Sequence, residues 1–280
     1  MIYFNCSAFK AKGRITVSAS GCRQTVFPLA FRPFRSLPGR SGSTDFFQAY
    51  QPFTKTHALR FKMLNFSYAN PTRLVFGRSA EHEVGRVMTS ILGRPGKVLV
   101  LFGGGSAHRT GILGAVEDSL QESGFAVIEM GGVQPNPRMG FVRDTIDWVR
   151  DQGIRAVVAV GGGSVIDTAK AVAAGLEYEG DAWDFFAGRA QVERALPVFA
   201  VLTIPAAGSE QSIRAVITHH GTKTGIGSEH IRPKAAFINP ERFSTLPAIH
   251  ISAGVCDMLS HIGERYFSNT AATDFVDGQA

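Results

Sequence analysis

Short apolar runs alternate with amphipathic stretches over most of the chain. The runs are rich in Val, Ile, Leu and Phe and are bounded by turn-forming residues, which predicts buried strands. We expect these strands at residues 74–76, 97–102, 125–130, 156–160 and 197–204, with a further apolar run at 64–66. Between them the apolar residues recur at helical spacing, which predicts helices at residues 80–92, 112–123, 141–152 and 166–176.

The regular alternation of strands and helices predicts an α/β fold built on a parallel sheet. Strands that are apolar throughout are buried on both faces, so helices should cover both sides of the sheet. Gly124 and Gly153 directly follow two of the expected helices, where glycine commonly ends a helix. Sheets of this kind bind their ligands at the carboxyl ends of the strands.

Two Gly-Gly-Gly-Ser loops, at residues 103–106 and 161–164, follow two of these strands directly. Glycine lets the backbone approach a bulky anion, and the helix that follows offers unpaired N–H groups and the positive end of its dipole. Neither loop matches the G-x-G-x-x-G or Walker A pattern, and either loop alone is better explained by a tight turn between strand and helix. Two such loops at one sheet edge favour a nucleotide site.

Two further pairs of polar residues are candidates for chemistry. Asp167 falls in the first turn of the helix after the second glycine loop, where it either contacts the cofactor or simply suits the helix dipole. Lys170 lies three residues further on and can pair with Asp167 on the same face. Asp257 and His261 are four apart, so on a helix they share one face, either as ligands of zinc or iron or as a hydrogen-bonded pair.

Four ordered stretches resemble the iron-containing (group III) alcohol dehydrogenase family, in its butanol-dehydrogenase-like branch. They are VQPNPR at 133–138, AVGGGSVIDTAKA at 159–171, LTIPAAGSE at 202–210 and GVCDMLSH at 254–261, which ERYF follows. The resemblance runs from about Met63 to the end of the chain. Ala207 departs from the family pattern, which has a threonine there, and this removes one hydroxyl near the cofactor.

The resemblance implies metal-dependent hydride transfer between NAD(P)H and a small alcohol or aldehyde. By matching motif positions, the cofactor site would comprise Gly105, Ser106, Asn136, Gly162, Gly163, Ser164, Asp167, Thr203 and Lys223. Asp257 and His261 would be the catalytic ligands of a divalent metal, iron or zinc. The first glycine loop carries no acid that would repel a 2′-phosphate, and Ser106, His108 and Arg109 tolerate one, which favours NADP while leaving NAD open.

The resemblance also implies a division of the chain into three parts. Residues 63–246 would form the dinucleotide-binding domain, and residues 247–280 would begin a helical metal-binding domain that is truncated before the family's later histidine ligands. Apolar faces that the missing helices leave uncovered favour association, so a homodimer is one expected outcome. Alternatives are a catalytically inactive nucleotide-binding remnant and a non-redox enzyme of the same architecture.

Residues 1–62 are expected to be a disordered, basic extension. They hold ten of the 29 Lys and Arg residues and one of the 23 acids, Asp45. A transit peptide and upstream sequence before a true start at Met63 are alternatives that this composition leaves open. Because the basic excess lies in this segment alone, no nucleic-acid partner is expected for the folded part.

Two further features bear on location. No apolar run is long enough to span a membrane, so no membrane partner is expected. The three cysteines form no disulfide or metal pattern, which predicts a reducing, cytoplasmic location.

Overall fold

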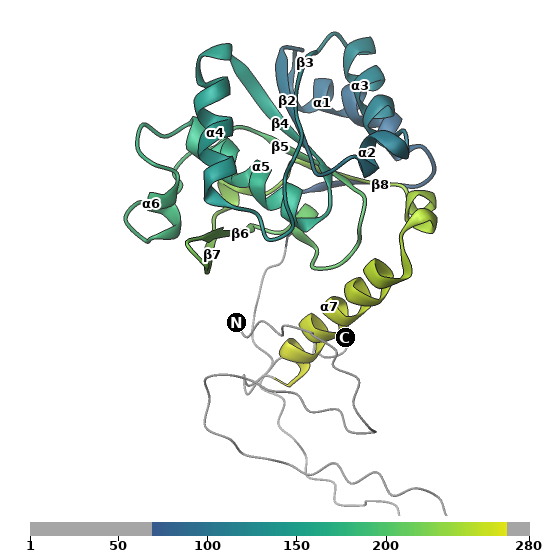
Figure 1. Ribbon diagram of the computed structural model, residues 1–280. Coiled ribbons are helices and arrows are strands. Elements are labelled where there is room, and N and C mark those ends of the chain that lie inside the picture. Colours follow the sequence, from purple (N-terminus) through teal and green to yellow (C-terminus); the bar gives the residue numbers. More distant parts are fainter. Residues whose placement is uncertain (1–68, 268–280) are drawn as a thin grey trace, which may run out of the picture. The chain divides into compact units, whose positions relative to one another are not determined.

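The computed structural model describes residues 69–267, in which six strands form one parallel sheet (Figure 1). The order across this sheet is β1-β8-β5-β4-β2-β3. Its strands are β1 (Arg73–Phe76), β2 (Lys97–Phe102), β3 (Ala126–Met130), β4 (Ile154–Gly161), β5 (Val198–Leu202) and β8 (Ala235–Ile238). The predicted α/β class with a parallel sheet is confirmed. The basic extension and the apolar run at 64–66 lie outside the described residues.

Helices cover both faces of the sheet, as the apolar strands predicted. They are α1 (Val84–Leu92), α2 (Ser106–Arg109), α3 (Ile112–Glu122), α4 (Met139–Val149), α5 (Gly163–Leu176) and α6 (Trp183–Phe186). On β2, Val98 and Val100 join the buried cluster that contains α1 and α3, whereas Leu99 and Leu101 join the cluster that contains α4 and α5. Figure 1 shows these two pairs of helices on opposite sides of the sheet.

The structure adds a two-stranded hairpin that the hydrophobic pattern did not predict. It consists of β6 (Arg214–His219) and β7 (Thr222–Gly227), which pair in antiparallel register. β7 reads TKTGIG, so glycine and polar residues hide the apolar alternation on which a strand prediction depends. The expected helix at 80–92 begins instead as the 3-10 turn η1 (Ala80–Glu83) before α1.

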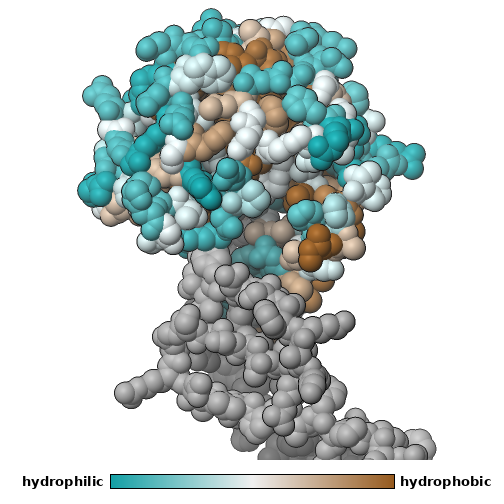
Figure 2. Space-filling view, in the orientation of Figure 1, coloured by the Kyte–Doolittle hydropathy of each residue, from teal (hydrophilic) through white to brown (hydrophobic). Residues whose placement is uncertain are grey.

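The last described element is the helix α7 (Ala248–Tyr266), which follows the 3-10 segment η5 (Pro240–Thr245). Its apolar side chains are largely exposed, with Ile249 at 71% and Leu259 at 61%. Figure 2 shows hydrophobic side chains gathered where α7 leaves the sheet domain. Among the helices of residues 69–267, none combines the length and the apolar composition that crossing a membrane requires.

Candidate functional site

Both glycine loops lie at the carboxyl edge of the sheet. They follow β2 and β4, which are hydrogen-bonded neighbours, so the two loops leave the sheet side by side. The chain after β3 closes on the first loop, because the N–H of Gly132 donates to the carbonyl of Gly103 across 2.9 Å. This edge is where parallel α/β sheets bind their ligands.

The second glycine loop is packed on one side and open on the other. A Cβ atom on Gly161 would lie 2.4 Å from Cγ2 of Val165, and one on Gly162 would lie 3.3 Å from Cβ of Ile204. A Cβ atom on Gly163, where α5 begins, would meet nothing within 4 Å. The first N–H groups of a helix have no partner within it, so this open side offers donors and the positive dipole end to an anion.

The chain after β5 forms the wall beside this loop. The N–H of Thr203 donates to the carbonyl of Gly161 across 3.0 Å. Gly254 of α7 packs on the same segment so closely that a Cβ atom there would lie 2.6 Å from the carbonyl oxygen of Pro205. At Gly254, α7 therefore touches the segment that carries Thr203.

Asn136 and Lys223 come together from two separate elements. Asn136 lies in the loop between β3 and α4, with a left-handed φ of 55°, and its Oδ1 accepts a hydrogen bond from Nζ of Lys223 across 3.2 Å. The hairpin is docked onto that loop, because the N–H of Thr218 donates to the carbonyl of Pro137 across 2.7 Å. Two residues that the family pattern assigned to the cofactor are thus neighbours in space.

Asp167 is engaged within the protein. Its Oδ1 accepts from Oγ of Ser209 across 2.6 Å, and its Oδ2 accepts from the N–H of Val216 across 3.0 Å. Burial raises the pKa of Asp167, against the charge of Lys170 and these hydrogen bonds. Contact between Asp167 and a cofactor stays a prediction, whereas its hold on the segment after β5 is a feature of the structure.

Lys170 is fully buried and does not pair directly with Asp167. Its Nζ donates to the carbonyl of Ser209 across 2.7 Å and to that of Arg214 across 2.7 Å. Burial lowers the pKa of Lys170 to about 8, against the opposing charges of Asp167 and Glu210. Both residues therefore bind the same segment rather than each other.

The first glycine loop leads into the single turn α2. A Cβ atom on Gly105 would lie 3.0 Å from Nη1 of Arg109, so this guanidinium folds back over the loop. The ring of His108 packs edge-on against Phe102, with ring centroids 5.0 Å apart. The polar residues that we expect to tolerate a 2′-phosphate, Ser106 among them, thus belong to this loop and its short helix.

Asp257 and His261 share one face of α7, as their spacing predicted. Nε2 of His261 lies 3.6 Å from Oδ1 of Asp257, and both side chains are partly exposed. Carboxylate and imidazole suit zinc or ferrous iron, but a catalytic site normally uses at least three protein ligands. Within residues 69–267, no group of three or more His, Cys, Asp and Glu residues is placed to hold a metal. The pair can supply only part of a ligand set.

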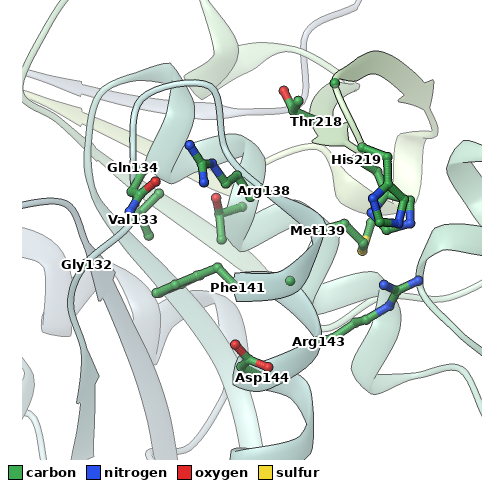
Figure 3. A pocket seen from close by; sticks show the side chains of 14 residues that line it. Gly132, Val133, Gln134, Arg138, Met139, Phe141, Arg143, Asp144, Thr218 and His219 are labelled. Carbon is green, nitrogen blue, oxygen red and sulfur yellow. The ribbon is translucent and has the colours of Figure 1, made fainter.

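A cavity of about 700 Å³ lies between α4 and the tip of the hairpin (Figure 3). Arg138 and Phe141 line it on one side and Thr218 on the other, and Oγ1 of Thr218 is buried without a hydrogen-bond partner. Neither glycine loop lines it, so it lies beside the expected cofactor edge. No sequence pattern indicated this cavity, because its walls come from segments far apart in the chain.

Comparison with known proteins identifies the family. Residues 71–240 match the family model for iron-containing alcohol dehydrogenases. The chain is 42% identical over 217 residues to a probable NADH-dependent butanol dehydrogenase of Bacillus subtilis, covering 77% of this chain and 55% of that protein. It is 37% identical over 220 residues to the NADPH-dependent aldehyde reductase YqhD of Escherichia coli, again covering 77% of this chain and 55% of that protein.

The solved structures agree with the sequence comparison. The crystal structure of an NADH-dependent butanol dehydrogenase from Thermotoga maritima superposes with a TM-score of 0.73 at 42% identity. It covers 77% of this chain and 55% of the other, so the chain spans about half the length of the relatives that it matches. The resemblance found in the motifs is confirmed, and the chain belongs to the iron-containing alcohol dehydrogenase family.

Proposed function

We propose that this chain provides the dinucleotide-binding part of an NAD(P)-dependent alcohol dehydrogenase or aldehyde reductase. The observation that carries the proposal is the open backbone at Gly163, where α5 begins at the carboxyl edge of the sheet beside Thr203. Relatives at 37–42% identity include proteins named for NADH-dependent and for NADPH-dependent activity. Small alcohols and aldehydes are the proposed substrates.

The chain's own residues would bind and orient the cofactor. The N–H groups of Gly163 and Ser164 and the dipole of α5 would hold the diphosphate. Lys223, held by Asn136 across 3.2 Å, would add a positive charge on the hairpin side. Thr203, in the segment after β5, would form one side of the site. The cofactor supplies the hydride, and the protein sets the geometry of its transfer.

A divalent metal, iron or zinc, is the second proposed cofactor. Asp257 and His261 would hold it together with ligands from beyond the described residues, because the pair alone is an incomplete set. Such a metal acts as a Lewis acid on the substrate oxygen when it is bound. The contact of α7 with Pro205 supports this placement, since it brings the helix that carries the pair to the wall of the cofactor site.

The proposed domain division gives residues 63–246 to cofactor binding and residues 247–280 to the start of a helical, metal-binding part. The exposed apolar side chains of α7, such as Ile249 and Leu259, support this division because such a face needs a cover. Further helices of a longer polypeptide or a second copy of the chain would provide it. A reducing, cytoplasmic location remains our prediction from the cysteine content.

The first experiment measures the binding of NADPH and of NADH to the full chain by fluorescence quenching. Butanal-dependent NADPH consumption is then measured with ferrous iron or zinc added. Metal-dependent turnover that disappears in His261→Ala, with binding retained, would support the whole proposal. Cys256→Ala is the matched control, because Cys256 lies exposed on the same helix and is expected to be neutral.

The second candidate is a nucleotide-binding protein without turnover. The incomplete ligand set within the described residues favours it. In that case both dinucleotides bind, and neither iron nor zinc produces any loss of NADPH with butanal. Failure to bind NADPH and NADH alike would overturn both candidates.

A further inference from the structure

Lys170 occupies an unusual position for a lysine. It is fully buried on α5, and its Nζ lies within hydrogen-bonding distance of four oxygens. Three of these are the backbone carbonyls of Ser209, Ser212 and Arg214, at 2.7, 2.9 and 2.7 Å. Burying a charge is costly unless it is fully hydrogen-bonded, and apolar side chains fill such space at lower cost. Lys170 therefore does more than fill the core.

Asp167 holds the same segment from one turn earlier on the same helix. It accepts from Oγ of Ser209 at 2.6 Å and from the N–H of Val216 at 3.0 Å. Oγ of Ser209 also lies 3.0 Å from Nζ of Lys170, so it joins the two side chains. Two side chains of α5 thus bind residues 209–216 at five backbone and side-chain groups.

The segment that is held connects two walls of the cofactor edge. Immediately before it, Thr203 and Ile204 lie against Gly161 and Gly162 of the second glycine loop. Its last three residues belong to β6, so the segment runs into the hairpin that carries Lys223 to Asn136. α5 itself begins at that glycine loop. One rigid helix therefore sets both walls relative to the backbone that would bind the diphosphate.

We propose that Lys170 and Asp167 are positioning residues of the cofactor site, which act by clamping residues 209–216 rather than by touching the dinucleotide. The proposal rests on the proposed function, because it concerns the affinity of the same site. In Lys170→Met, three carbonyls lose the hydrogen bond from Nζ, so we expect the segment and the hairpin to be held less firmly. The affinity for the cofactor then falls, because a displaced Lys223 no longer meets the diphosphate.

The first measurement is the Kd for NADPH of the full chain and of Lys170→Met, at a temperature well below the unfolding midpoint of both. We expect the Kd of the variant to rise at least about tenfold, which equals about 1.4 kcal/mol. Hydrogen exchange should quicken in residues 209–227 while α4 remains unchanged. Lys234→Met is the matched control, because it removes the same charge from an exposed position and should leave the Kd unchanged.

Two variants of Asp167 separate clamping from direct contact. Asp167→Asn keeps an oxygen for the N–H of Val216 and an amide group for Ser209, so it should retain affinity within about threefold of the wild type, whereas Asp167→Ala should lose about tenfold. An equal loss of NADPH affinity in both variants would mean that the carboxylate charge itself is needed, and would overturn the proposed clamp. These variants also decide the matter if Lys170→Met fails to fold.

The outcomes separate this proposal from the proposed function. Wild-type chain that binds NADPH, together with a Lys170→Met variant that binds equally well, would overturn the clamp alone. A variant with a lower unfolding midpoint but an unchanged Kd would mean that Lys170 serves stability only. Wild-type chain that binds neither NADPH nor NADH would overturn the proposed function, and with it any role of the clamp in that function.

Discussion

Glu81 and Arg242 form an ion pair between the start of the sheet domain and the segment that leads into α7. Nε of Arg242 donates to Oε1 of Glu81 across 2.7 Å, and Nδ2 of Asn239 donates to Oε2 across 3.0 Å. Glu81 is only 1% exposed. Burial alone would raise the pKa of Glu81, but its hydrogen bonds, those from Arg242 and Asn239 among them, outweigh burial and lower it. The carboxylate is therefore charged and holds η5 against η1.

Arg242→Met should lower the free energy of unfolding by about 3 kcal/mol, because it leaves a buried carboxylate without its cation. Urea denaturation at neutral pH measures this change. Arg78→Met is the matched control: Arg78 pairs with Glu241 at the surface, with side chains 85% and 56% exposed, and should contribute less than about 1 kcal/mol. Equal losses of unfolding free energy in the two variants would contradict a larger contribution from the buried pair.

The same pair predicts a pH dependence. Because the folded protein lowers the pKa of Glu81 below its ordinary value of 4.5, the stabilisation is complete above pH 4.5 and is lost as the pH falls through the lowered value. The difference in unfolding free energy between wild type and Arg242→Met should therefore shrink below pH 4.5. A difference that stays constant down to pH 3 would show that the charge of Glu81 is irrelevant.

Gly85 lies where α1 crosses α3. A Cβ atom there would lie 2.0 Å from the carbonyl oxygen of Ser119, so Gly85→Ala must push the two helices apart. We expect a loss of about 3 kcal/mol, although alanine is the better helix former by about 1 kcal/mol. Gly114→Ala, in α3 with nothing within 4 Å of its Cβ position, should be neutral or stabilising. Thermal unfolding of both variants measures the contrast.

Glu117 on α3 and Glu129 on β3 form a carboxyl pair that predicts the opposite pH dependence. Burial, followed by the neighbouring carboxyl group of Glu129, raises the pKa of Glu117 to about 7. Oε1 of Glu117 is buried without a hydrogen-bond partner, which a shared proton would satisfy. A raised pKa in the folded state means that the stabilisation is complete below pH 4.5 and is lost as the pH rises through about 7.

Glu117→Gln should remove this loss and exceed the wild type in stability at pH 8. Each pKa unit corresponds to about 1.4 kcal/mol, and screening by solvent reduces the gain to the order of 1 kcal/mol. Unfolding free energies between pH 4 and pH 9 measure it. Glu122→Gln, on the exposed face of the same helix, is the control and should leave the pH profile unchanged. A parallel profile for Glu117→Gln and wild type would contradict the shared proton.

Arg109 is the residue that we expect to favour NADPH over NADH. Its guanidinium lies over the first glycine loop, where a 2′-phosphate would gain a charge-assisted hydrogen bond. Arg109→Leu should therefore weaken NADPH binding about tenfold and leave NADH binding unchanged. Arg94→Leu, exposed in the loop before β2, should change neither Kd. Equal loss for both dinucleotides would place Arg109 at a part of the cofactor that they share.

Local pattern predicted five of the six strands of the sheet, and it missed the short strand β8 between β1 and β5. The strand at 97–102 was predicted to the residue, because KVLVLF is short, apolar and bounded by glycines on both sides. The two glycine loops and the family motifs were likewise identified from the sequence. These features depend only on residues that are close together in the sequence, so they could be predicted without the tertiary structure.

Tertiary structure decided the partners of the polar groups. Asp167 bonds Ser209 and Val216 rather than Lys170, which was its nearest candidate along the helix. Glu81 meets Arg242, and the hairpin meets the loop that carries Asn136, across stretches of chain that no local pattern spans. Such contacts depend on how the crossovers fold the chain back on itself. Local sequence therefore determined most of the sheet and its helices, whereas packing determined which groups meet.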